Sequence, residues 1–150
     1  MICAIIQARM GSTRLPGKVL KPIIADKTAL ELLIMRVSVS TMIDKIIVAT
    51  TTQDEDNSIE DLCKELDVLC TRGNTHDVLD RYYQAAVYMN SPQYIVRLTA
   101  DCPLHDSAVI DQTIRGFLSG EYDYGSNQNY PDGLDVEIFT MKTLKKLWEQ

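Results

Sequence analysis

Short apolar runs alternate with longer amphipathic segments along most of the chain. Four runs rich in isoleucine, valine and leucine predict buried β-strands, at residues 2–6, 45–50, 68–71 and 94–98. Between them, apolar residues recur at helical spacing after Thr28 and over residues 58–66, 77–89 and 108–118. Strands that are buried on both faces and alternate with helices are typical of βαβ units. The sequence therefore predicts an α/β fold with a mostly parallel sheet.

Two of the predicted helices carry further local signals. Thr28 and Glu31 have the spacing of a capping box just ahead of an apolar face. The helix over residues 77–89 is expected to bury one set of side chains, namely Leu79, Tyr82, Tyr83, Ala86 and Val87.

The last third of the chain has weaker patterns. Residues 123–127 and 134–139 are less regular strand candidates, and residues 140–150 follow a helical pattern without a stop signal. No repeat or linker divides the 150 residues, so we expect one domain over 1–150. Because the last helical pattern has no terminating residue, we leave open that this domain is truncated at its C-terminus.

The composition of the chain argues against several classes of binding partner. A net charge of −6 argues against a nucleic-acid surface, which normally carries a basic field. No apolar run is long enough to span a membrane, and no leader precedes the first predicted strand, so we expect no membrane partner and a cytoplasmic location. The cysteines have neither C-x-x-C spacing nor histidine pairs, so zinc is not expected; they are Cys3, Cys63, Cys70 and Cys102.

The loop that follows the first predicted strand has the chemistry of a polyphosphate site. Glycine lets backbone N–H groups approach phosphate oxygens, arginine adds bidentate contacts, and lysine adds a mobile charge. Open α/β sheets also bind ligands at the carboxyl ends of their strands. A solvated basic loop is the alternative interpretation. The residues concerned are Arg9, Gly11, Ser12, Thr13, Arg14, Gly17 and Lys18.

Two common phosphate-binding motifs do not fit this loop. A Walker A loop needs four residues between its glycines and a Ser or Thr after the lysine, whereas five residues separate Gly11 from Gly17 and Val19 follows Lys18. A dinucleotide-binding G-x-G-x-x-G is also absent. A Walker-type NTPase is therefore a weak alternative.

Carboxylates near later strand ends are candidates for a metal site. Asp101 follows the fourth predicted strand, so it should lie at the same sheet edge as the cationic loop, where it can hold Mg²⁺ against phosphate oxygens. Capping of a turn before Pro103 is the alternative role. Asp135 and Glu137 would share one face of a strand, either binding metal or lying solvated on an exposed edge. We expect Asp135 to be the second metal ligand.

Further polar residues are candidates for substrate binding. Arg72 follows the third predicted strand and is expected either to contact a base or phosphate, or to pair with Asp77 or Asp80. Thr50 closes the second strand, where it lines a base pocket or forms an ordinary turn. Asn127, at the end of a later strand candidate, is included among the substrate-binding residues.

Other polar residues are assigned structural roles. Arg97 lies within a strand and is expected to be an ion-pair partner, whereas His76 and His105 are interpreted as polar loop residues. Tyr82, Tyr83 and Trp148 are interpreted as core or interface residues, not as a stacking platform for bases.

Several of these segments resemble the cytidylyltransferase family. That family includes acylneuraminate and 3-deoxy-manno-octulosonate cytidylyltransferases, and the strongest resemblance is to its spore-coat-polysaccharide-biosynthesis branch. The similar stretches keep the family's order over nearly the whole chain. They are residues 5–18 (IIQARMGSTRLPGK), 47–50 (IVAT), 72–73 with 77–83 (RG, DVLDRYY), 96–104 (VRLTADCPL) and 133–137 (GLDVE).

The resemblance implies a fold, a reaction and roles for the candidate residues. The fold is the three-layer α/β/α fold of nucleotide-diphospho-sugar transferases, which is glycosyltransferase-A-like. The reaction is attack by a sugar hydroxyl on the α-phosphorus of CTP with release of pyrophosphate. The loop backbone and side chains would hold the triphosphate, Asp101 and Asp135 would bind Mg²⁺, and Arg72 with the backbone at Ala8 would read cytosine. The loop side chains concerned are Arg9, Ser12, Arg14 and Lys18.

One departure and two alternatives accompany this interpretation. Members that activate sugar acids usually carry asparagine after the loop lysine, where this chain has Val19, so the acceptor stays open. The expected partners are CTP and a sugar or sugar acid, with a homodimer as one option because members often dimerise. The alternatives are a non-catalytic nucleotide-binding or assembly module and a transferase that uses another nucleotide.

Overall fold

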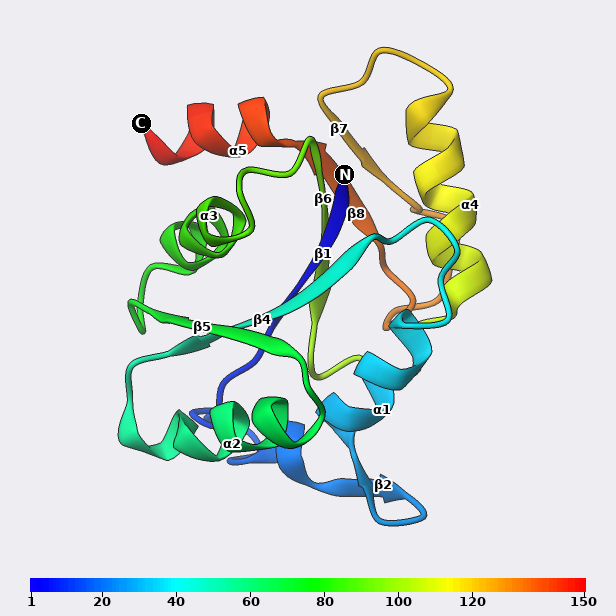
Figure 1. The fold of residues 1–150 in the computed structure, drawn as a ribbon. Helices are drawn as coiled ribbons and strands as arrows, with labels where there is room; N and C mark the ends of the chain where they lie inside the picture. Colours follow the sequence, from blue (N-terminus) through cyan, green and yellow to red (C-terminus); the bar gives the residue numbers. More distant parts are fainter.

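The computed structural model describes residues 1–150 and is built around one six-stranded sheet (Figure 1). Four of its strands are mutually parallel: β1 (Ile2–Gln7), β4 (Lys45–Thr51), β5 (Leu69–Gly73) and β6 (Tyr94–Thr99). Two antiparallel strands, β8 (Glu137–Thr140) and β7 (Tyr124–Ser126), extend the sheet beyond β6. The strand order β5-β4-β1-β6-β8-β7 confirms the predicted mostly parallel sheet.

Helices cover both faces of the sheet and complete the predicted three layers. One face packs against α1 (Ala29–Val37), α2 (Asn57–Glu65) and α4 (Ser107–Leu118), and the other against α3 (Val78–Tyr88) and α5 (Met141–Trp148). Figure 1 shows α1 and α4 on the right of the sheet and α3 and α5 on its left. Alternate residues of β1 enter the two cores, Ala4 and Ile6 on the first face and Cys3 and Ile5 on the second. This division explains why the strand sequence is apolar throughout.

The strand order creates a ligand-binding position between β1 and β6. From β1 the chain builds outward through β4 and β5, then crosses to β6 on the other side of β1. Such a reversal of strand order is a topological switch point, and the loops after the two flanking strands leave a crevice there. Gln7 of β1 pairs in register with Thr99 of β6, so the two strands end at the same level.

Capping side chains mark the residues at which two of the helices begin. Thr28 caps α1, since its side-chain oxygen accepts a hydrogen bond from the Glu31 amide at 3.2 Å. The reciprocal half of the predicted capping box is missing, because the Glu31 carboxylate pairs with Lys27 instead. Asp77 caps α3 by accepting from the Asp80 amide at 2.8 Å.

Some elements differ from the sequence prediction. A short hairpin, β2 (Pro22–Ile24) and β3 (Lys27–Thr28), precedes α1, and two 3₁₀ turns, η1 (Lys18–Leu20) and η2 (Asp54–Asp56), were not predicted. The predicted strand 134–139 begins only at Glu137, so Asp135 lies in the preceding loop and does not share a strand face with Glu137. The prediction that Asp135 and Glu137 share one face of a strand was therefore wrong.

The prediction of which α3 side chains are buried was also partly wrong. Tyr82 and Ala86 are buried as predicted, but Leu79 and Val87 are exposed, and Arg81 is buried in their stead. The helix is rotated toward Arg81 because its guanidinium donates to the Asn74 and Thr75 carbonyl oxygens of the loop before the helix.

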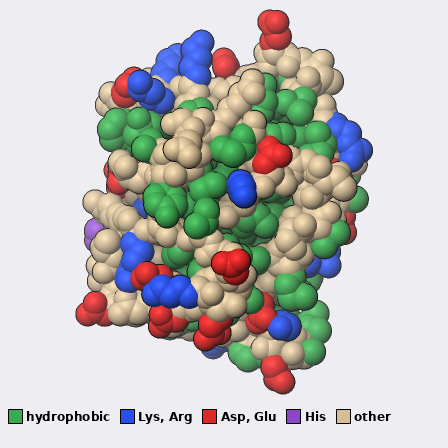
Figure 2. All heavy atoms as spheres, in the orientation of Figure 1, with side chains coloured by type: hydrophobic (Ala, Val, Ile, Leu, Met, Phe, Trp, Pro, Cys, Tyr) green, Lys and Arg blue, Asp and Glu red, His purple; other side chains and the backbone are tan.

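The outer surface divides by charge. Figure 2 shows a basic group over α5 at the upper left, which carries Lys142, Lys145 and Lys146, and mostly acidic groups along the lower part around α2. None of the helices has the length and apolar character needed to cross a bilayer.

Candidate functional site

The loops after β1 and β6 together line a polar cavity of about 320 Å³ at the switch point. Arg9, Arg14 and Lys18 bring cations from the first loop, and Asp101 brings a carboxylate from the second. The juxtaposition expected from the sequence, a cationic loop facing Asp101, is therefore present. The lining residues of this cavity, which we call the loop cavity, are Gln7, Arg9, Ser12, Thr13, Arg14, Lys18, Val19, Arg97, Thr99, Ala100 and Asp101.

An ion pair joins the two walls of the loop cavity. The Lys18 Nζ atom lies 2.5 Å from the Asp101 Oδ2 atom. Partial burial raises the pKa of Asp101, but the Lys18 ammonium and the Thr99 hydroxyl outweigh it, so the pKa lies below its ordinary value. Asp101 is thus an ionised carboxylate among cations, which is the state needed to bind a metal ion.

The shape of the first loop depends on a buried carboxylate. Asp56 accepts hydrogen bonds from the Met10 amide at 2.7 Å, the Thr51 amide at 3.3 Å and the Thr51 hydroxyl. The far end of the loop is closed by the Gly17 amide, which donates to the Met10 carbonyl at 2.9 Å. Gly17 has φ 68°, a left-handed conformation that favours glycine. Asp56 therefore fixes the first residue of the turn that presents the cations.

A second cavity of about 400 Å³ adjoins the first, and we call it the adjoining cavity. Arg97 and Thr99 line both cavities, so β6 forms their common wall. Arg97 pairs with Glu137, as the sequence analysis expected of a strand arginine, and Tyr124 donates to the other carboxylate oxygen at 2.9 Å. The lining residues are Arg97, Thr99, Cys102, Tyr124, Ser126, Asn127, Gln128, Asp135 and Glu137.

The predicted site residues divide between these places. The loop cavity gathers Arg9, Ser12, Arg14, Lys18 and Asp101, whereas the adjoining cavity contains Asn127 and Asp135.

Two further predicted residues lie in the backbone just outside the loop cavity. Ala8 is buried and its amide donates to the Ala49 carbonyl at 3.2 Å. Gly11 packs beside Glu55, because a Cβ atom added to it would lie 2.8 Å from the Glu55 Oε1 atom. Both residues contribute backbone at the start of the loop, and neither has a polar side chain that could contact a ligand.

Arg72 and Asn127 already have internal partners. The Arg72 guanidinium donates to the carbonyl oxygens of Thr51 and Gln53 at 2.9 and 2.7 Å, and pairs with Glu60 at 3.0 Å. It therefore pairs with neither Asp77 nor Asp80. Asn127 spans its loop, since its side chain donates to the Leu134 carbonyl at 2.8 Å and accepts from the Val136 amide at 2.7 Å.

Four buried side-chain atoms have no hydrogen-bond partner in the protein. They are the Thr50 hydroxyl oxygen, the Nε and Nη2 atoms of Arg81 and the Nδ1 atom of His105. Burial lowers the pKa of Arg81, and the nearby Arg9 lowers it further. Sequence reasoning gave Arg81 no role because it reads as one more polar position on a helix. The Asp77–Tyr83 stretch that holds it was the only signal available.

Two carboxylates are candidate donors for a metal ion, Asp101 in the loop cavity and Asp135 in the adjoining cavity. Cys102 lies near both of them, because its Sγ atom is 3.9 Å from the Asp101 Oδ1 atom and it lines the adjoining cavity together with Asp135. Asp135 also accepts from the Gly133 amide at 3.1 Å. No cluster of three or more metal-ligating side chains is present. Two carboxylates fit Mg²⁺, which usually completes its shell with water and substrate phosphates.

The sequence matches the model of one protein family and two curated relatives. The family model described as cytidylyltransferase matches residues 3–150. An uncharacterized protein of Methanocaldococcus jannaschii is 45% identical over 148 residues, which are 99% of this chain and 60% of that protein. The spore coat polysaccharide biosynthesis protein SpsF of Bacillus subtilis is 35% identical over 147 residues, 95% of this chain and 60% of its own. The chain thus spans 60% of the length of these relatives.

Solved structures agree on the fold. A cytidylyltransferase from Leptospira borgpetersenii has a TM-score of 0.92 at 38% identity, covering 99% of this chain and 63% of its own. A CMP:2-keto-3-deoxy-manno-octonic acid synthetase solved with CTP has a TM-score of 0.77 at 14% identity, covering 99% and 77%. A Mycobacterium tuberculosis protein solved with manganese has a TM-score of 0.71 at 19% identity, covering 99% and 76%.

Proposed function

Because the chain belongs to the cytidylyltransferase family, we propose that it transfers CMP from CTP to a sugar or sugar acid and releases pyrophosphate. The observation that carries this proposal is the loop cavity, in which Arg9, Arg14 and Lys18 face Asp101 across the switch point. The name of the Bacillus relative supports a place in polysaccharide biosynthesis.

The two cavities suggest how the substrates are arranged. The cations of the loop cavity would hold the triphosphate, with the amide groups of the glycine-containing turn close to its oxygens. The acceptor would occupy the adjoining cavity, so that its attacking oxygen and the α-phosphorus meet at the shared wall formed by Arg97 and Thr99. Such in-line transfer needs positioning and charge neutralisation more than covalent chemistry from the protein.

Asp101 and Asp135 would hold Mg²⁺ in this reaction. A bound Mg²⁺ supplies neutralisation of the charge that develops on the phosphate oxygens. Lys18 would give up its contact with Asp101 and turn to the triphosphate, because the metal ion takes over the neutralisation of the carboxylate. Arg9 and Arg14 would keep the leaving pyrophosphate in place.

A thermal-shift panel with four nucleoside triphosphates tests the proposal. CTP with Mg²⁺ at about 100 times its dissociation constant should stabilise the protein by about 2.7 kcal/mol, and ATP, GTP and UTP at the same concentration should stabilise it less. Absence of stabilisation by CTP would refute the proposal. Equal stabilisation by all four nucleotides would leave nucleotidyl transfer but remove the choice of cytosine.

A further inference from the structure

We propose that the acceptor bound in the adjoining cavity is an uncharged, hydroxyl-rich sugar and not a sugar acid. This inference rests on the proposed function, since it assigns the adjoining cavity to the acceptor. It concerns which chemical class of acceptor the cavity selects.

The charges of the adjoining cavity are unfavourable for an anion. Its lining holds two carboxylates, Asp135 and Glu137, and one cation, Arg97. The loop cavity has the opposite balance, with Arg9, Arg14 and Lys18 against Asp101. Like charges in a partly desolvated site repel strongly, so a carboxylate on the acceptor would be disfavoured in the adjoining cavity.

The single cation of the cavity is already committed. The Arg97 guanidinium pairs with Glu137 and lies with its Cζ atom 5.9 Å from the centre of the Tyr82 ring. The other oxygen of Glu137 accepts from Tyr124, which holds the carboxylate against the arginine. An acceptor carboxylate would have to compete with Glu137 for this guanidinium.

A metal ion would not supply the missing positive charge. Asp101 and Asp135 would hold it, and its charge would offset these two carboxylates and the triphosphate. It would therefore leave no excess positive charge for an acceptor carboxylate.

The neutral polar groups of the cavity suit hydroxyl groups. Thr99, Tyr124 and Ser126 present hydroxyls, and Gln128 presents an exposed amide. Ser126 and Gln128 can both donate and accept, as a sugar hydroxyl does, whereas the Thr99 and Tyr124 hydroxyls donate to Cys102 and Glu137 and can still accept from a sugar. A volume of about 400 Å³ is sufficient for one monosaccharide.

The test compares sugars that differ only in their charge. Two matched pairs are titrated into ¹⁵N-labelled protein with CTP and Mg²⁺: methyl glucoside against methyl glucuronide, and methyl galactoside against methyl galacturonide. We expect the neutral member of at least one pair to shift the amide resonances of residues 126–128 and to bind about tenfold more tightly than its acidic partner.

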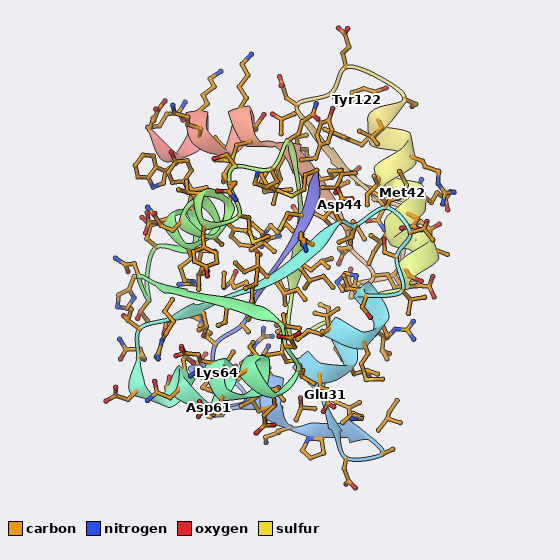
Figure 3. The ribbon with its side chains drawn as sticks, in the orientation of Figure 1. Glu31, Met42, Asp44, Asp61, Lys64 and Tyr122 are labelled. Carbon is orange, nitrogen blue, oxygen red and sulfur yellow. The ribbon has the colours of Figure 1, made fainter.

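Two variants change the charge of the cavity in the same direction. Glu137→Gln frees Arg97 from its ion pair, and Gln128→Lys adds a cation at an exposed position of the cavity wall. Each should raise the affinity for the acidic sugars about tenfold relative to the affinity for the neutral sugars. Asp61→Asn, on the far exposed face of α2 in Figure 3, is the matched control and should change neither.

Acidic sugars that bind as tightly as their neutral partners would overturn the inference. It is also overturned if no sugar shifts residues 126–128, because the cavity would then not hold the acceptor. A failure of the proposed function itself appears elsewhere, as absence of stabilisation by CTP in the thermal-shift panel.

Discussion

The contact between Lys18 and Asp101 joins two loops that are 83 positions apart in the sequence. Each residue was predicted separately, Lys18 from the chemistry of its loop and Asp101 from its place after a strand. Their side chains are 27% and 40% exposed, so a ligand that enters the loop cavity can reach both. The pair therefore marks where a nucleotide and its metal ion would exchange contacts with the protein.

Substitution of the two partners should separate binding from turnover. Lys18→Ala is expected to weaken CTP binding about tenfold, because one charge contact with the triphosphate is lost. Asp101→Asn is expected to abolish pyrophosphate release while keeping much of the CTP affinity, because it removes a metal ligand but no cation. Calorimetric titration with CTP and a pyrophosphate-release assay measure the two effects.

Lys64→Ala is the control for these variants. Lys64 lies on the exposed side of α2, beside Asp61 in Figure 3, and its ammonium group pairs with Glu60 and Asp61. It should leave both CTP affinity and turnover unchanged. Parent-like turnover in Asp101→Asn would show that this carboxylate does not bind the metal ion.

The chemistry of single residues predicted the cations of the site but not Asp56, the buried carboxylate that holds their loop in place. Arg9, Arg14 and Lys18 are recognisable because such a cluster after a buried strand has few other uses. Asp56 is not, because the acidic run that contains it reads as the ordinary start of a helix. Its role depends on the Met10 amide, 46 positions away, which only the tertiary structure brings within reach.

At the scale of elements, long periodic segments were predicted well and short ones were not. The four parallel strands and the helices between them follow from apolar runs and helical spacing. The β2–β3 hairpin did not, because each strand is three residues or fewer and its turn uses Ala25 and Asp26 at positive φ, which no glycine announces. β8 starts late because the chain around Asp135 turns back on itself through the Gly133 amide.

A buried carboxylate of α4 holds the loop that follows α1. Asp111 of α4 is 5% exposed and accepts hydrogen bonds from the hydroxyls of Ser40 and Thr41 and from the Thr41 amide, in the loop after α1. Asp111→Ala should therefore lower the free energy of unfolding by about 2–3 kcal/mol, as measured by urea denaturation. Asp61→Ala, at an exposed carboxylate of α2, should stay within about 0.5 kcal/mol of the parent.

The effect of Asp111 should also depend on pH. Burial raises the pKa of Asp111, but the hydrogen bonds from Ser40 and Thr41 outweigh it and leave the pKa below its ordinary value of 3.8. The stabilisation is then complete above pH 3.8 and is lost as the pH falls through the lower pKa of the folded state. The difference between parent and Asp111→Ala should be constant near neutral pH and shrink below pH 3.8. A constant difference down to acid unfolding would contradict this account.

At the scale of the whole molecule, the switch point divides the sheet into two parts with different tasks. β1, β4 and β5 lead on one side to the cationic loop and its support, Asp56. β6, β8 and β7 lead on the other side to Asp101 and to the adjoining cavity. The order of strands was not predictable from the sequence, because periodicity shows that strands alternate with helices but not on which side of β1 each one pairs.

A ligand at the switch point should therefore tie both parts of the sheet together. With CTP and Mg²⁺, we expect amide hydrogen exchange to slow about tenfold in residues 9–18 and also in residues 100–104, because one ligand contacts both loops. Residues 38–44, which lead to the opposite, amino ends of β1 and β4, serve as the internal reference and should not change. Mass spectrometry of peptic fragments measures all three segments in one experiment. Protection of only one of the two loops would mean that the nucleotide does not bridge β1 and β6, and the arrangement of substrates across their shared wall would then be wrong.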